Sequence, residues 1–159
     1  MNAALSMVEA PRTGAVFQRP YEIRFSDCDP AGIVFYPQYF VMLNGLVEDW
    51  FGIGLGIPYR TLIVDRRVGL PSVRLEVDFT AVSRMGEAVE LVLAVERLGR
   101  ASLTLVHTIA GAGEARMRMR QVLVATSLES HRAIALPDDV RAAIVARGYA
   151  SNPPAAAAA

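Results

Sequence analysis

The sequence has no lysine, one cysteine and two histidines among its 159 residues. A single cysteine excludes an internal disulfide framework, and no CxxC or Cys/His zinc pattern occurs, so neither a metal site nor a cofactor is expected. The 16 basic residues, all arginine, balance 16 acidic ones. This balance argues against a nucleic-acid partner or an anionic membrane surface. The low cysteine content suits a reducing compartment, and we therefore expect a cytoplasmic protein.

Long apolar runs are also missing. None approaches the roughly 20 residues needed to cross a bilayer, and residues 1–18 lack the basic and apolar pattern of a secretory signal. We predict that residues 1–18 form a loose tail and that the low-complexity end SNPPAAAAA places a second tail at residues 150–159. The remaining residues, 19–149, have the length of one packed domain.

Residues 21–51, YEIRFSDCDPAGIVFYPQYFVMLNGLVEDWF, organise the chain. Apolar and polar side chains alternate over residues 21–26, which predicts a strand with one buried face. The DCDPAG loop follows, and its Gly32 permits backbone conformations that a side chain would forbid. Because proline is favoured at the start of a helix, we expect a helix from Pro37 to about Phe51. Apolar residues surround most of this helix, which predicts burial nearly all round.

The hydrophobic period then changes to two. Strands are predicted over residues 72–82, 89–96, 102–110 and 115–126, joined mostly by short turns. A short helix is predicted from Pro137 to about Arg147. Together these elements indicate an α+β protein in which an antiparallel sheet wraps round one long buried helix. An exposed strand edge on such a sheet favours pairing with a second copy.

Asp29 is the strongest candidate for chemistry. A carboxylate beside the N-terminal end of an apolar helix can act as nucleophile or general base on a carbonyl carbon. The structural alternative is a turn aspartate that accepts backbone N–H groups, and the residues alone leave it open. Asp27 is a second candidate base with the same alternative. The helix end also offers free N–H groups, among them that of Tyr36, to an anionic oxygen.

The run FSDCDPAGIVFYPQY resembles the signature of the 4-hydroxybenzoyl-CoA thioesterase family, in which an aspartate precedes Pro-Ala-Gly and then Tyr-Pro. VGLPSVRLEVDF is similar to the second strand of that family, and the pattern stays compatible to about Leu128. The resemblance implies a hotdog fold and hydrolysis of an acyl-CoA thioester, with coenzyme A as part of the substrate. It also implies a homodimer with active sites where two sheets join, and we expect a homotetramer beyond it.

The resemblance further implies roles for single residues. The aspartate at the position of Asp29 would attack the thioester carbonyl to form an acyl-enzyme anhydride. Tyr36 would contribute its backbone N–H, and Gly32 would shape the loop unless it is an ordinary turn glycine. Three side chains are expected to contact the acyl group: Phe35, Phe40 and Asn44. For Asn44 the alternative is a hydrogen bond to neighbouring backbone or to a dimer mate.

Arg97 and Arg100 flank a strand turn, and basic residues near this turn meet the coenzyme A phosphates in the family. Arginine suits phosphate through its paired N–H donors. A row on a later strand, at residues 116, 118 and 120, offers alternative arginines. Cys28 is expected to pack rather than react, because adjacent carboxylates raise the pKa of a thiol. His107 is interpreted as a satisfied sheet histidine, and His131 as a loop residue.

These features favour an aromatic acyl-CoA thioesterase. A related branch, associated with the Tol-Pal system, handles aliphatic acyl-CoA and usually has histidine after the tyrosine, where this chain has Pro37. Hotdog-fold hydratases pair an acidic residue with a nearby histidine, and no histidine occurs here before His107. A non-catalytic acyl-CoA binding module is the remaining alternative, since a fold does not determine a function.

Overall fold

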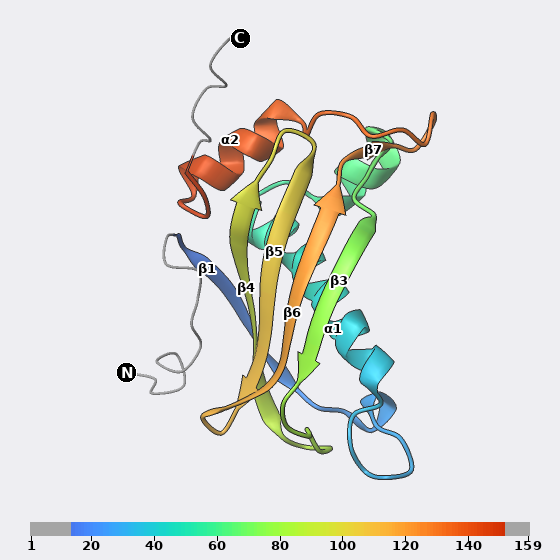
Figure 1. The fold of residues 1–159 in the computed structure, drawn as a ribbon, viewed down its shortest axis with the longest axis vertical. Helices are drawn as coiled ribbons and strands as arrows, with labels where there is room; N and C mark the ends of the chain where they lie inside the picture. Colours follow the sequence, from blue (N-terminus) through green and yellow to red (C-terminus); the bar gives the residue numbers. More distant parts are fainter. Residues whose placement is uncertain (1–13, 152–159) are drawn as a thin grey trace.

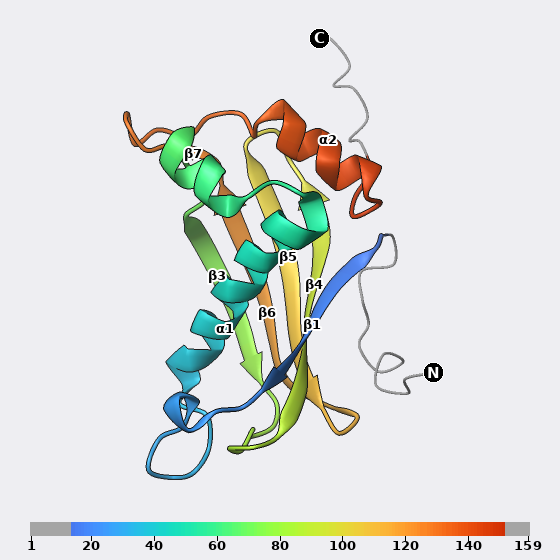
Figure 2. The same cartoon turned by 180° about the vertical axis from the view of Figure 1, so that it is seen from behind.

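The computed structural model describes residues 14–151, which contain a five-stranded antiparallel sheet in the order β1-β4-β5-β6-β3. Its strands are β1 (Val16–Glu22), β3 (Ser72–Phe79), β4 (Ala88–Leu98), β5 (Ser102–Gly111) and β6 (Glu114–Val124). The long helix α1 (Tyr36–Asp49) crosses one face of this sheet (Figure 2). The predicted α+β arrangement, a sheet around one long helix, is therefore confirmed.

Smaller elements gather at one end of the main sheet (Figure 1). Strands β2 (Val68–Gly69) and β7 (Thr126–Ser127) form a second, two-stranded sheet. Helix α2 (Asp138–Ala146) lies beside the turn between β4 and β5. A π-helical segment (Thr61–Asp65) occupies the connection predicted between the long helix and the second strand. The loop that precedes α1 lies at the opposite end of the sheet, together with the β5–β6 hairpin and the connection from β3 to β4 (Figure 1).

Helix α1 buries only one side. Its buried residues recur every three or four positions and join the core with the inner face of the sheet: Tyr39, Met42, Leu43, Leu46 and Val47. Each such aliphatic side chain contributes about 1.5–3 kcal/mol when fully buried. Val41, Asn44 and Glu48 form an exposed stripe on the other side, with Val41 64% exposed. The prediction of burial nearly all round is thus wrong for the single chain, because these residues share the face that points away from the sheet.

The helical region also continues further than predicted. A π-helical segment (Trp50–Leu55) follows α1 directly, and Gly56, at φ 74°, ends it. Both Trp50 and Phe51 are fully buried. A Cβ on Gly54 would lie 2.6 Å from Trp50 Cδ1, so glycine allows the segment to close over the tryptophan. Gly54 therefore permits tight packing inside the helical region, and Gly56 is the glycine that ends it.

The first strand lies earlier than predicted. β1 takes in residues 16–18, which were assigned to the N-terminal tail, and it ends before the short 3-10 turn of Phe25–Asp27. Phe25, expected on the buried face, is 84% exposed. The cause is Asp27, whose carboxylate accepts the Arg24 N–H at 2.7 Å and turns the chain out of the sheet. The remaining tail predictions, at residues 1–13 and 152–159, lie outside the described residues.

Candidate active site

The loop between the first turn and α1 is held by its own backbone. The Asp29 N–H donates to the Ile33 carbonyl at 3.0 Å, and the Gly32 N–H donates to the Asp29 carbonyl at 2.9 Å. This closure puts Gly32 at φ 75°, in the left-handed region. A side chain there would be strained, so glycine is the residue that this loop geometry favours.

Asp29 is partly exposed, and its two carboxylate oxygens differ. Oδ1 accepts the Ala31 N–H at 2.8 Å, which is the turn contact considered as the structural alternative. Within residues 14–151 the structure shows no hydrogen bond to Oδ2. One oxygen therefore stabilises the loop while the other is available to a substrate or a water molecule.

The N-terminal end of α1 begins at Tyr36, one residue before the predicted start. The Phe35 N–H donates to the Asp27 carbonyl at 2.9 Å, and the Gln38 N–H donates to the Phe35 carbonyl at 2.8 Å. Pro37 has no N–H, and helix geometry gives the N–H of Tyr36 no partner within the helix. Its N–H group and the helix dipole can therefore stabilise a nearby anionic oxygen.

Asp27 is linked to this end of the helix through its backbone carbonyl, which accepts the Phe35 N–H. Its side chain is 6% exposed, and Oδ2 accepts both the Tyr21 O–H at 2.9 Å and the Arg24 N–H at 2.7 Å. Burial, together with the hydrogen bond to Asp27, raises the pKa of the Tyr21 phenol. These contacts favour the structural role for Asp27 over that of a second base.

A pocket of about 300 Å³ opens beside Tyr36. It is lined by Ile33, Val34, Tyr36, Tyr39 and the segment from Phe79 to Ser83. The ring of Phe79 packs edge-on against Tyr36 at a centroid distance of 6.2 Å and lies 6.0 Å from the ring of Tyr39. Sequence patterns did not identify this wall, because residues 79–83 were assigned to a strand and its turn. The pocket is at the small end of the range for ligand sites.

The three residues predicted to contact the acyl group do not lie together in the single chain. The rings of Phe35 and Phe40 flank Tyr36 at centroid distances of 5.6 and 6.4 Å, although neither lines the 300 Å³ pocket. Asn44 lies two turns further along, on the exposed side of α1. In the single chain, Asn44 and the two phenylalanines therefore do not line one common pocket.

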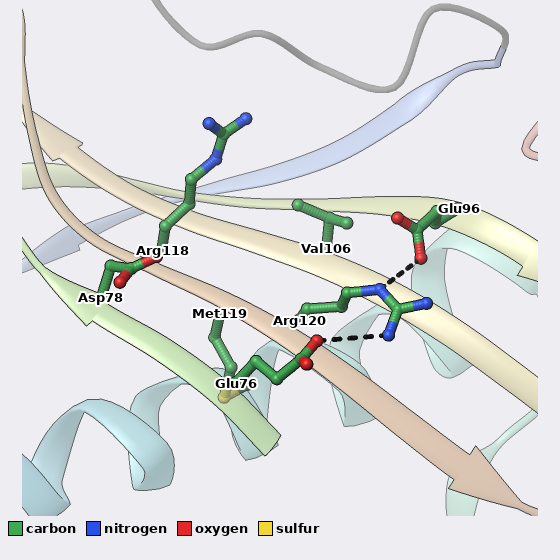
Figure 3. Close-up of a pocket in the computed structure, with 7 residues that line it drawn as sticks. All are labelled: Glu76, Asp78, Glu96, Val106, Arg118, Met119 and Arg120. Carbon is green, nitrogen blue, oxygen red and sulfur yellow. Dashed lines mark hydrogen bonds and ion pairs between the residues drawn. The ribbon is translucent and has the colours of Figure 1, made fainter. Parts of the chain in front are cut away.

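Arg97 and Arg100 are both exposed and lie at the end of the sheet that carries α2, opposite the Asp29 loop (Figure 1). One chain therefore does not bring them to Asp29. The alternative row of arginines is interrupted, because Arg116 is buried while residues 118 and 120 stay on the outer face of the sheet. There Arg120 pairs with Glu96 at 2.7 Å and with Glu76 at 3.3 Å (Figure 3).

The other reactive residue types are accounted for. Burial and the Asp27 and Asp29 carboxylates raise the pKa of the Cys28 thiol, which disfavours the thiolate. Fully buried His107 has its Nε2 2.8 Å from Gln121 Oε1, but its Nδ1 has no hydrogen-bond partner among the described residues, so the prediction of a satisfied histidine holds for one ring nitrogen only. Burial lowers its pKa to about 4, so the ring is neutral near pH 7. Among the described residues, no group of His, Cys, Asp and Glu could hold a metal ion. No helix there is long and apolar enough to cross a membrane.

A five-stranded sheet curled round one long helix is the hotdog fold, and the family model that the chain matches is one of thioesterases. Residues 23–144 match the family model described as the thioesterase-like superfamily, and the chain belongs to that superfamily, within its 4-hydroxybenzoyl-CoA thioesterase family. It is a thioester hydrolase.

Individual relatives agree with this assignment. The chain is 30% identical over 126 residues to a 4-hydroxybenzoyl-CoA thioesterase of Pseudomonas sp. strain CBS-3, covering 74% of this chain and 89% of that protein. The solved structure of that thioesterase gives a TM-score of 0.73 at 27% identity, covering 80% of this chain and 98% of the other. A 1,4-dihydroxy-2-naphthoyl-CoA hydrolase of Synechococcus elongatus is 36% identical over 85 residues, covering 53% of this chain and 60% of the relative.

Proposed function

We propose that this protein hydrolyses an aromatic acyl-CoA thioester, of benzoyl or hydroxybenzoyl type, to the free acid and coenzyme A. The observation that carries the proposal is the juxtaposition at one end of α1. There Asp29, whose carboxylate keeps one free oxygen, lies in the loop that leads to Tyr36, the first residue of α1, whose N–H has no partner within the helix, and a pocket walled by aromatic rings opens beside Tyr36. An acyl carbonyl placed between carboxylate and N–H would meet both a nucleophile and an oxyanion donor.

Asp29 can hydrolyse the thioester by either of two routes. As nucleophile, an Asp29 oxygen bonds to the carbonyl carbon, the C–S bond breaks, and the thiolate of coenzyme A leaves. Water then hydrolyses the resulting anhydride and restores the carboxylate. As general base, Asp29 takes a proton from water while the water oxygen attacks the carbonyl carbon, and the thiolate leaves as before. In both routes the Tyr36 N–H stabilises the negative carbonyl oxygen, a contribution worth about 10²–10³ in rate for one such donor.

The aromatic choice rests on the pocket wall. The ring of Phe79 lies edge-on to Tyr36 at a centroid distance of 6.2 Å and tilted against Tyr39 at 6.0 Å, and aromatic pairs of this kind extend readily to a bound ring. The Pseudomonas and Synechococcus relatives are named for hydroxybenzoyl and dihydroxynaphthoyl thioesters, which supports the same class. Asn44 can donate or accept one hydrogen bond without a charged partner, so a 4-hydroxyl group is not expected to be obligatory.

We also propose that the enzyme works as a homodimer joined through β3. The β1 edge carries Pro20, which has no N–H to offer a further strand. The β3 edge has no proline over Ser72–Phe79, and its Leu75 and Phe79 are 46% and 51% exposed on the helix side. A second copy would pair with this edge and cover both side chains.

Such pairing would bring the corresponding arginines of a second copy to the end of the sheet that holds Asp29, which Arg97 and Arg100 of the same chain do not reach. Because the two β3 strands would run antiparallel, the partner is reversed, and its β4–β5 turn lies at the same end of the joined sheet as this chain's Asp29 loop. The partner subunit's Arg97 and the partner subunit's Arg100 could then meet the phosphates of a bound substrate. A homotetramer of two such dimers, acting in the cytoplasm without a cofactor, completes the proposal.

The test is a panel of benzoyl-, 4-hydroxybenzoyl- and butyryl-CoA, followed by release of the coenzyme A thiol. We expect benzoyl-type esters to give substantially higher kcat/KM than butyryl-CoA. The two benzoyl esters should differ by much less than the roughly 10⁴–10⁵ of a site built around one polar contact. Preference for butyryl-CoA over every aromatic ester would favour the aliphatic branch, and binding without thiol release would favour a non-catalytic module.

A further inference from the structure

Arg116 is buried although it is charged. Its residue is 7% exposed, and it lies where the pairing of β5 with β6 changes register. Ile109 pairs with Met117 and Ala110 pairs with Ala115, so Arg116 is the additional residue of a β-bulge. A bulge redirects a side chain from the face that simple alternation would give it. This explains why Arg116 leaves the outer row of arginines.

The guanidinium group reaches the segment that walls the aromatic pocket. Nη1 donates to the Val82 carbonyl, and Nη2 lies 3.6 Å from the Glu87 carboxylate and 3.4 Å from the Gly111 carbonyl. The backbone carbonyl of Arg116 accepts the Thr80 N–H at 3.0 Å. Residues 80–82 are therefore held by both the side chain and the main chain of one residue.

That segment in turn holds the loop that carries Asp29. The Ser83 carbonyl, next in the chain after Val82, accepts the Val34 N–H at 2.9 Å. Val34 lies two residues before Tyr36, whose N–H is the proposed oxyanion donor. The Glu87 carboxylate that pairs with Arg116 also accepts the Arg84 N–H at 3.0 Å, which fixes the far side of the same turn. A continuous path of contacts thus runs from Arg116 to the start of α1.

We propose that Arg116 is a positioning residue that sets the pocket wall and, through Val82, Ser83 and Val34, the N–H of Tyr36. This inference deepens the proposed function and rests on it. A buried charge is costly unless it is paired, and an apolar residue of similar volume is often as stable or more so. Arginine carries its donors in a planar fork, and here Nη1 and Nη2 hold carbonyls and a carboxylate in different directions at once.

The experiment compares Arg116→Met, Arg116→Lys and the control Arg60→Met, which removes an exposed arginine paired with Asp65. We expect Arg116→Met to lower kcat about 10- to 100-fold, because small misplacements of reacting groups have effects of that size, while KM changes by less than about threefold. Arg116→Lys should fall in between, and Arg60→Met should match the wild type. Amide exchange at Val34 should quicken in both Arg116 variants, relative to core amides of β5.

Both results are needed for support. Unchanged kcat in a folded Arg116→Met protein, or unchanged exchange at Val34, overturns the inference. If Arg116→Met does not fold, the same two measurements on Arg116→Lys decide. If the wild type hydrolyses no ester, the proposed function fails, and exchange at Val34 alone then decides whether Arg116 holds the loop.

Discussion

Replacing Asp29 by asparagine separates its two possible roles. The amide oxygen of Asp29→Asn can still accept the Ala31 N–H that Oδ1 now accepts at 2.8 Å, so the loop keeps its internal contact. What the variant loses is the charged oxygen needed to attack a carbonyl or to take a proton from water. General-base catalysis alone is worth about 10²–10⁴ in rate, so kcat should fall by at least that range.

The expected effect on stability is small. A hydrogen bond to a charged group contributes about 1.5–3 kcal/mol and a neutral one about 0.5–1.5 kcal/mol, and the Asp29 side chain is partly exposed. The free energy of unfolding should therefore fall by about 1 kcal/mol at most, which for a chain of this length shifts Tm by about 2–4 °C. Thermal unfolding beside thiol release measures both quantities on one sample.

Asp27→Asn is the matched control, because it makes the same change two residues away. Asp27 is 6% exposed and its carboxylate accepts two hydrogen bonds, from Tyr21 and Arg24. Weakening buried contacts of this kind should cost about 1–3 kcal/mol of stability. A folded Asp29→Asn protein with near-normal turnover would refute the catalytic assignment. If Asp27→Asn instead lost turnover while folded, Asp27 would be the base.

Three further outcomes follow from the same structure. Arg97→Ala and Arg100→Ala should raise KM for the full coenzyme A thioester and leave KM for a truncated pantetheine thioester unchanged, since phosphate contacts are remote from the carbonyl. Wild-type binding should weaken at higher salt, so the increase in KM should shrink there; equal losses on both substrates would contradict this role. His107 has its folded-state pKa lowered from 6.5 to about 4, so protons bind preferentially to the unfolded chain, and stability should fall as the pH drops from about 6.5 towards 4, by up to about 3 kcal/mol. His107→Gln should remove that part of the pH dependence in unfolding titrations, and an unchanged titration would refute it. Leu75→Lys should shift the protein towards monomer in sedimentation velocity, because lysine on an edge strand opposes pairing, whereas the control Val64→Lys, at a residue 50% exposed in the π-helical segment outside β3, should not; a Leu75→Lys protein that sediments as the wild type does would count against the β3 interface.

Sequence periodicity predicted most of the sheet because two-residue alternation survives wherever one face is buried. β5 and β6 begin and end within two residues of their predicted bounds. The first strand was misplaced for a local reason. Alternation of Tyr21, Ile23 and Phe25 continues past the end of β1, but the hydrogen bond from the Arg24 N–H to the Asp27 carboxylate bends the chain away. A side-chain cap of this kind leaves no periodic signal.

In the candidate site, too, residues close in sequence could be predicted and residues joined only by tertiary contacts could not. Asp29, Gly32 and Tyr36 lie within eight positions of one another, so a motif and the rules for helix ends bring them together. The pocket wall at Phe79 to Ser83 reaches the loop only through tertiary bonds such as Val34 N–H to the Ser83 carbonyl. No spacing along the chain encodes that contact.

Arg116 shows how one additional residue changes what a strand can do. Strict alternation would put it beside residues 118 and 120 on the outer face, where it would be one more solvated charge. The bulge between Ala115 and Met117 turns its guanidinium to the carbonyl of Val82 instead. Bulges are enriched near active sites because they redirect single side chains. Burying an arginine is costly unless its charge is paired. The turn that Arg116 holds is hydrogen-bonded to the loop that carries Asp29, through the Ser83 carbonyl and the Val34 N–H, so a role in placing that loop accounts for a charge at this buried point.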